Sequence, residues 1–253
     1  MPPLATLLTD FGTADGYVAE MKGVLLSGAP AAQLVDVSHD VPAQDVEFAR
    51  LAFARYWRRF PAGTVHIVVV DPDVGTSRKA LAIESDGRFA VGPDNGVLSP
   101  AMLLPGARAV SLHIPQGASP TFHGRDVFAP AAVRLLNGDA LDDLGSPYSD
   151  AALRRTPEAQ RRQDGGQDGL VLAVDRFGNL ITNLTGRGEG TVEIAGKLLR
   201  VSRTYADVTE GQLLALVGSH GLIEVAVRGG HAARTLGIGR GTPVTLRREG
   251  GAA

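Results

Sequence analysis

The chain has 253 residues, of which 44% are hydrophobic and 21% charged, and its formal net charge is −2. This length suits one large domain or two small ones, and the near-neutral charge gives no electrostatic case for binding nucleic acid or an anionic membrane. Cysteine is absent, which excludes disulfides, thiolate metal sites and thiol nucleophiles and leaves histidine and carboxylate as candidate metal ligands.

The N-terminal residues carry no basic segment and no long apolar segment, so the sequence predicts no secretory signal. No apolar run approaches the roughly 20 residues that a membrane-spanning helix needs. We therefore expect a cytoplasmic protein.

The first part of the chain alternates strands and helices. Apolar runs predict buried strands at 4–8, 33–37 and 65–70, and apolar residues at helical spacing predict helices over about 15–28 and 45–60. This β-α-β-α-β order is typical of a mostly parallel sheet flanked by helices.

The same domain continues with two short strands, 80–85 and 88–91, that flank an Asp-Gly hairpin turn. A strand at 107–114 follows, and then a helix that ends near Leu136. We predict an α/β N-terminal domain over residues 1–145.

The composition changes after this domain. Residues 146–169 are polar and contain proline, glycine and several arginines, which predicts an interdomain linker. Residues 170–253 contain short apolar strands separated by glycine turns and no convincing helix, which predicts a small all-β C-terminal domain. The expected strands are 170–174, 180–184, 191–194, 197–201, 213–217, 222–227 and 243–246.

Two acids and an arginine follow the strand at 65–70. Asp71 and Asp73 come directly after it, and Arg78 follows a short polar turn. Ligands of open α/β sheets bind just past the carboxyl ends of strands, so this loop is a candidate site. The loop alone is explained equally well as a structural turn with a solvated arginine.

Other charged residues stand near predicted strand ends or at the entrance of the last helix, and a parallel sheet would gather several of them at one edge. His123 has polar and glycine neighbours at a predicted helix entrance, whereas His66 lies within an apolar strand and suits a core or edge position. The sequence contains no phosphate loop, no nucleophile elbow and no His-Glu-x-x-His motif. The candidate residues are Asp10, Asp71, Asp73, Arg78, Asp94, His123, Arg125 and Asp126.

These residues allow two ways of activating water. Asp71, Asp73, His123 and Asp126 are possible ligands of a divalent metal, although no compact ligand spacing supports such a site. Without a metal, water has a pKa of about 15.7 and needs another activator. A guanidinium and an imidazole beside an acid can hold and polarise a water molecule.

The C-terminal domain has two polar interruptions between apolar strands. Residues 175–183 and 218–221 are explained as hairpin turns or as loops that present side chains to a polar small molecule.

The order of these motifs resembles that of the S-adenosyl-L-methionine hydroxide adenosyltransferases, the adenosine-forming S-adenosylmethionine hydrolases related to fluorinase and chlorinase. The resemblance spans both domains. The motifs that carry it are Thr9-Asp10-Phe11-Gly12, Asp71-Pro72-Asp73-Val74-Gly75 with Arg78, Gly92-Pro93-Asp94-Asn95-Gly96, Thr121-Phe122-His123-Gly124-Arg125-Asp126, Asp175-Arg176-Phe177-Gly178-Asn179 and Ser219-His220-Gly221-Leu222-Ile223-Glu224.

The resemblance implies a barrel-like C-terminal domain and a homotrimer whose sites lie between the N-terminal domain of one subunit and the C-terminal domain of its neighbour. It implies that water, as hydroxide, displaces L-methionine from C5′ of the ribose, without metal or cofactor. The family's Asp-Arg-His set falls on Asp71, Arg78 and His123. We expect Arg78 and His123 to stabilise the developing hydroxide, while Asp71 orients the water or accepts its proton.

The same resemblance implies substrate-binding roles for four further residues. Asp10 would hold the ribose hydroxyls, Asp175 the methionine ammonium, Ser219 the methionine carboxylate and Asn179 the adenine edge.

Halide-using relatives differ from this chain at three places. They lack the Asp-Arg-His set, and they have aromatic residues where this chain has Gln44 and Ile181. The complete set favours water over halide as the nucleophile. The alternatives are a halide-using adenosyltransferase, a non-catalytic S-adenosylmethionine or nucleoside binding protein, and a metal-dependent hydrolase.

Overall fold

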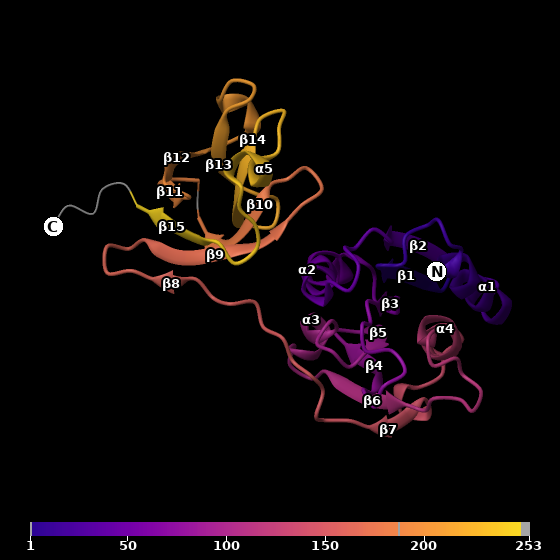
Figure 1. Ribbon diagram of the computed structural model, residues 1–253. Coiled ribbons are helices and arrows are strands. Elements are labelled where there is room, and N and C mark those ends of the chain that lie inside the picture. The colour runs from indigo at the N-terminus through magenta and orange to yellow at the C-terminus, as the bar shows by residue number, and fades with distance from the viewer. Residues whose placement is uncertain (1, 187, 249–253) are drawn as a thin grey trace. The chain divides into compact units, whose positions relative to one another are not determined.

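The computed structural model describes residues 2–186 and 188–248 (Figure 1). The chain forms two compact units that divide between Arg155 and Thr156. Within the described residues, no helix is long and apolar enough to cross a membrane.

The first unit is built on a seven-stranded sheet of order β2-β1-β3-β5-β4-β6-β7. Strands β2, β1, β3 and β5 are parallel, whereas β4, β6 and β7 join by antiparallel pairing. The α/β class is confirmed, but parallel pairing is confined to half of the sheet, because the two-residue turn between β4 and β5 permits only antiparallel neighbours. The strands are β1 (Leu4–Thr9), β2 (Gln33–Ser38), β3 (Val65–Val69), β4 (Ala80–Ser85), β5 (Arg88–Pro93), β6 (Arg108–Leu112) and β7 (Gly145–Pro147).

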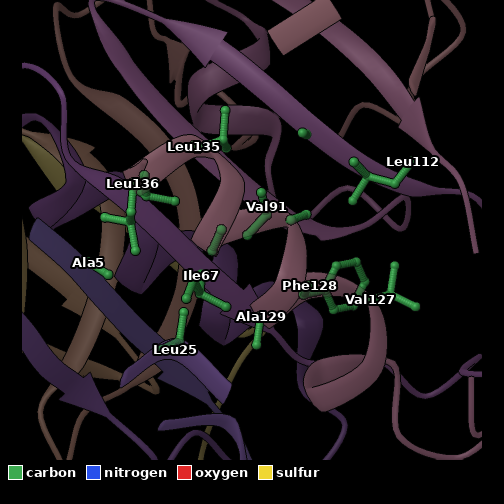
Figure 2. Packing of buried hydrophobic residues seen from close by; sticks show 14 of the residues in the cluster. Ala5, Leu25, Ile67, Val91, Leu112, Val127, Phe128, Ala129, Leu135 and Leu136 are labelled. Atoms are coloured by element: carbon green, nitrogen blue, oxygen red, sulfur yellow. The ribbon is translucent and has the colours of Figure 1, made fainter. Parts of the chain in front are cut away.

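Helices cover both faces of this sheet. Successive strand residues point to opposite faces, so Leu7 and Ile67 pack with α1 and α4, while Leu8 and Val68 pack with α2 and α3. Figure 2 shows the first of these two cores. The helices are α1 (Tyr17–Gly28), α2 (Val46–Tyr56), α3 (Ser99–Met102) and α4 (Ala129–Leu136), with short turns η1 (Trp57–Arg59), η2 (Gly124–Phe128) and η3 (Leu141–Asp143).

The second unit is a closed β-barrel. Strand β9 pairs with β15 on one side and with β10 on the other, which closes the circuit β9-β10-β14-β13-β12-β11-β15 around an apolar core. The prediction of an all-β, barrel-like domain is therefore confirmed. The strands are β8 (Gln160–Arg161), β9 (Gln167–Val174), β10 (Leu180–Thr185), β11 (Thr191–Ile194), β12 (Lys197–Ser202), β13 (Leu213–Val217), β14 (Leu222–Val227) and β15 (Pro243–Arg247).

Two short helical segments in the barrel unit were not expected from the sequence. They are η4 (Tyr205–Asp207) and α5 (Ala232–Leu236). Segments of three and five residues are too short to show a helical period.

The segment predicted as a linker, 146–169, carries more structure than its composition suggests. Its first residues belong to β7, its last belong to β9, and only 148–159 lack regular structure between β7 and β8. The Asp94 carboxylate holds the start of this stretch, accepting hydrogen bonds from the Tyr148 hydroxyl (3.1 Å) and the Ala152 backbone N–H (2.7 Å).

Candidate functional site

The candidate site in the first unit lies at the carboxyl edge of the parallel strands. Thr9 at the end of β1 pairs with Val69 at the end of β3, in parallel register. Asp10 and the loop that begins at Asp71 therefore leave the sheet on the same edge.

Asp71 and Arg78 form a buried ion pair. The guanidinium donates through Nε to Asp71 Oδ1 at 2.9 Å and through Nη2 to Oδ2. The side chains are only 5% and 8% exposed, so the bidentate geometry compensates two desolvated charges. The guanidinium also lies 5.5 Å from the ring centroid of Phe128, a cation–π contact that further fixes its position.

His123 joins this pair through its ring. Arg78 Nη2 donates to His123 Nδ1 at 3.0 Å, and because guanidinium is always a donor, Nδ1 accepts and the ring proton resides on Nε2. Burial lowers the pKa of His123, and the Arg78 charge lowers it further, against the opposing effect of Asp71 and Asp126. The site therefore holds a neutral imidazole with its Nε2–H available as a donor.

Two close backbone approaches bring His123 to Arg78. Gly75 has φ of +80°, and a Cβ there would lie 2.3 Å from the Pro120 carbonyl oxygen, so the loops carrying Arg78 and His123 pack directly on each other. Gly124 lies against Met21 of α1, where a Cβ would be 3.1 Å from the sulfur. His123 is also followed by a π-helical turn, η2, a rare conformation that is frequent at functional sites.

The remaining charged candidates near the sheet edge have structural partners or lie apart. Asp73 is exposed, and Asp126 is held by Arg125 Nε (2.7 Å) and the Ser119 N–H (2.8 Å). Among the described residues, no group of three histidine or carboxylate side chains is placed to hold a metal ion. The geometry thus groups Asp71, Arg78 and His123 and leaves Asp73 outside.

Asp10 lies on the same edge with one carboxylate oxygen in use. Oδ2 accepts the backbone N–H of Gln44 at 2.7 Å. The side chain is partly exposed, as a residue that meets a ligand needs to be.

In the barrel unit, Asp175 and Asn179 form one local cluster. Asp175 Oδ1 accepts the backbone N–H groups of Phe177 (2.9 Å) and Asn179 (2.8 Å), and Oδ2 accepts Asn179 Nδ2 (2.9 Å). The carboxylate therefore both shapes the β9–β10 hairpin and supplies a negative charge. Ser219 is exposed in the β13–β14 turn, with its hydroxyl 3.2 Å from His220 Nδ1.

A pocket of about 350 Å³ opens beside this hairpin. Its walls include Phe177, Asn179 and Tyr205, with Val227 and a glycine pair completing the lining. Tyr205 hydrogen-bonds Asn179, and burial raises its pKa, with the charges of Glu224 and Asp175 raising it further.

Tyr205 was not identified as a site residue from the sequence. Its surroundings in the chain show no motif, and it approaches Asn179 only because the barrel closes. A single tyrosine in a polar segment does not by itself indicate a binding site.

The fold defines a two-domain class of protein in which an α/β unit precedes a β-barrel. The chain belongs to the S-adenosylmethionine hydroxide adenosyltransferase family: the family's N-terminal domain model matches residues 5–145 and its C-terminal domain model matches residues 169–245.

Similar proteins include a Thermus thermophilus protein named (R)-S-adenosyl-L-methionine hydrolase, 44% identical over 94% of this chain and 97% of that protein. A fluorinase from Actinopolyspora mzabensis is 27% identical over 98% of each chain. Among solved structures, an uncharacterized conserved protein from Thermotoga maritima aligns with a TM-score of 0.87 and 31% identity, over 97% of this chain and all of that one.

Proposed function

We propose that this protein hydrolyses S-adenosyl-L-methionine to adenosine and L-methionine. The oxygen of water forms a bond to C5′ of the ribose while the C5′–sulfur bond breaks, and the sulfur keeps the electron pair. The sulfonium leaves as a neutral thioether, so no general acid is required at the leaving group. One proton of the water is released when adenosine forms.

The observation that carries this proposal is the buried Asp71–Arg78–His123 cluster. Arg78 and the His123 Nε2–H supply positive charge and a hydrogen-bond donor for an incipient hydroxide in a desolvated place. Both oxygens of Asp71 accept from Arg78, so in place of the role on the water expected from the sequence we assign Asp71 the role of orienting the guanidinium. No metal or cofactor has a part in this scheme.

The proposed binding groups fit the polar parts of the substrate. A carboxylate such as Asp10 can accept from ribose hydroxyls, Asp175 can pair with an ammonium group, and Ser219 can donate to a carboxylate. The pocket beside Asn179 has two aromatic walls, Phe177 and Tyr205, which suit a flat base such as adenine.

These groups are divided between the two units, and we propose that a complete site forms between the N-terminal domain of one subunit and the C-terminal domain of its neighbour in a homotrimer.

Light scattering tests the oligomeric state. Mixed oligomers of His123→Ala and Asp175→Ala test the sharing of sites when they are assayed at substrate concentrations well below the wild-type KM, where each variant alone has little activity. Random assortment gives about a quarter of the sites with both residues intact, so activity rises on mixing. If each chain supplies its own complete site, the mixture shows only the average of the two variants' activities.

The reaction itself is tested by incubating the protein with S-adenosylmethionine and identifying the products. We expect adenosine and methionine in equal amounts, with incorporation of ¹⁸O from labelled water into adenosine. Because the Thermus relative is named for the (R) form, both sulfonium epimers are assayed.

Tight binding without turnover would identify a binding protein. Halogenated nucleoside in the presence of chloride or fluoride would identify a halide-using enzyme, and loss of activity on chelation would identify a metal-dependent one.

We also propose a cytoplasmic location, which fractionation of the native host followed by immunodetection tests.

A further inference from the structure

Gln44 has a backbone conformation that its residue type does not favour. In the described chain, three non-glycine residues have positive φ: Gln44 (65°), Asp86 (49°) and Ala195 (47°). The left-handed region is unfavourable for a residue with a Cβ, so each case needs a local reason.

Hairpin geometry explains two of the three. Asp86 and Ala195 each precede a glycine of positive φ and form the two-residue turns of β4–β5 and β11–β12. Such turns require positive φ at both positions. Gln44 lies between β2 and α2, at the third position of a β-turn that the Asp45 N–H closes on the Pro42 carbonyl at 2.9 Å, a position where positive φ also occurs.

The conformation of Gln44 directs its N–H to Asp10. The backbone N–H donates to Asp10 Oδ2 at 2.7 Å, while the next residue, Asp45, already faces the helix and accepts the Phe48 N–H at 2.9 Å as the cap of α2. The Gln44 side chain is exposed, so the contact depends on the backbone alone.

The β2–α2 connection holds the neighbours of Asp10 as well. The His39 carbonyl accepts the Gly12 N–H at 2.8 Å, and His39 Nδ1 lies 2.8 Å from the buried hydroxyl of Thr9. One connection therefore fixes the segment on both sides of Asp10 and one oxygen of its carboxylate.

We propose that Gln44 is a positioning residue for Asp10: its left-handed backbone holds Oδ2 and leaves Oδ1 directed to the ligand. Within the described residues, the Gln44 N–H is the one hydrogen-bond partner of the Asp10 carboxylate. The ligand in question is the ribose of the substrate, so this inference rests on the proposed function.

The kinetic test compares two variants of Gln44. Gln44→Val places a β-branched residue at positive φ, so the backbone moves and the hydrogen bond to Asp10 is lost. Loss of one charge-assisted hydrogen bond raises KM about tenfold, with a smaller change in kcat. Gln44→Gly keeps the N–H and removes the strain, and its KM stays well below that of Gln44→Val.

Ala195→Val is the matched control, because it strains the same backbone conformation in a barrel hairpin. It lowers the melting temperature and leaves KM unchanged. The inference is overturned if Gln44→Gly is as defective as Gln44→Val, or if Ala195→Val raises KM to the same extent.

A second measurement separates this inference from the proposed function. Amide exchange at Gln44, followed by NMR, is slow in the wild type and faster in Asp10→Ala, while the Phe48 amide, bonded to Asp45, is unaffected. If the wild type does not turn over S-adenosylmethionine but the Gln44 amide opens in Asp10→Ala, only the proposed function fails. Equal exchange of Gln44 in both proteins overturns the positioning role, whatever the activity.

Discussion

The two groups of candidate site residues are assembled in different ways. In the α/β unit, Arg78 and His123 are 45 positions apart in sequence and meet through packing of two loops and a helix. In the barrel unit, Asp175 and Asn179 are four positions apart and are joined by a single turn. Both groups contain a buried member, with His123 4% and Asn179 6% exposed, but the second adjoins an exposed turn in which Phe177 is 73% exposed.

This difference suggests a division of labour. Buried, mutually oriented charges act strongly on charge that develops in a transition state, because they need no reorganisation during the reaction. Polar groups on a local loop contact the substrate in its ground state and its transition state alike. Substitutions in the α/β unit should therefore lower kcat, and those in the barrel should raise KM.

The largest effect is expected for Arg78→Ala. The substitution removes the proposed electrostatic stabiliser and should lower kcat about 10³-fold. It also leaves the Asp71 carboxylate buried without its partner, which typically costs about 3 to 5 kcal/mol of folding stability. Steady-state kinetics and thermal melting measure the two effects.

Two variants keep this experiment interpretable. Arg78→Lys retains the charge but not the bidentate geometry, so it should fold better than Arg78→Ala and still lose most of kcat. Arg108→Ala removes an exposed, ion-paired arginine of the same unit and should change neither quantity greatly. A wild-type kcat in Arg78→Lys would show that the bidentate geometry of the guanidinium is not needed for the reaction.

His123→Ala is expected to lower kcat about 10²-fold, as for loss of one positioned proton-carrying group. Burial and the charge of Arg78 lower the pKa of His123, so the ring stays neutral at pH values just below the ordinary pKa of histidine. We therefore expect kcat to decline only at more acidic pH. A pH profile of kcat measures this limb, which should disappear in His123→Ala. An acidic limb that is identical in both proteins would assign it to another group.

Asp175→Ala should act on binding. Loss of a charged partner for the substrate ammonium is worth about 2 kcal/mol, or about 30-fold in KM. Asp164→Ala is the control, since Asp164 also shapes a turn in the same unit by accepting the Gly166 N–H at 2.9 Å. A fall in kcat without a rise in KM for Asp175→Ala would contradict the division between the units.

The smallest expected effect concerns acid stability, and again the units differ. His66 is buried among Phe53, Tyr56, Trp57 and Phe60, and burial, with a contribution from Arg88, lowers its pKa to about 3. The folded state therefore binds fewer protons than the unfolded one. The stability from neutral His66 is complete above about pH 6.5 and is lost as pH falls towards 3.

At pH 5.5 this loss amounts to about 1.4 kcal/mol in the α/β unit. Hydrogen exchange resolved by residue measures it separately in each unit. His66→Phe should flatten the pH dependence, and His220→Gln, in an exposed turn of the barrel, should leave it unchanged. Equal acid destabilisation in wild type and His66→Phe would show that other groups control it.

Local patterns predicted much of the fold because they report short-range physics. Apolar runs and glycine turns located β1, β3 and the barrel strands, and the Asp-Gly turn located the β4–β5 hairpin. Strands of two or three residues, such as β7 and β8, went unpredicted, since so few residues show no period.

The order of residues along the chain decides that Asp71 and Arg78 share one loop after a buried strand, and that an α/β unit precedes a β unit. Only the tertiary structure decides that His123 meets Arg78, that Tyr205 meets Asn179, and that Gln44 adopts a left-handed backbone beside Asp10. Propensity and turn chemistry act over a few residues, whereas these contacts depend on how helices pack on the sheet and how the barrel closes.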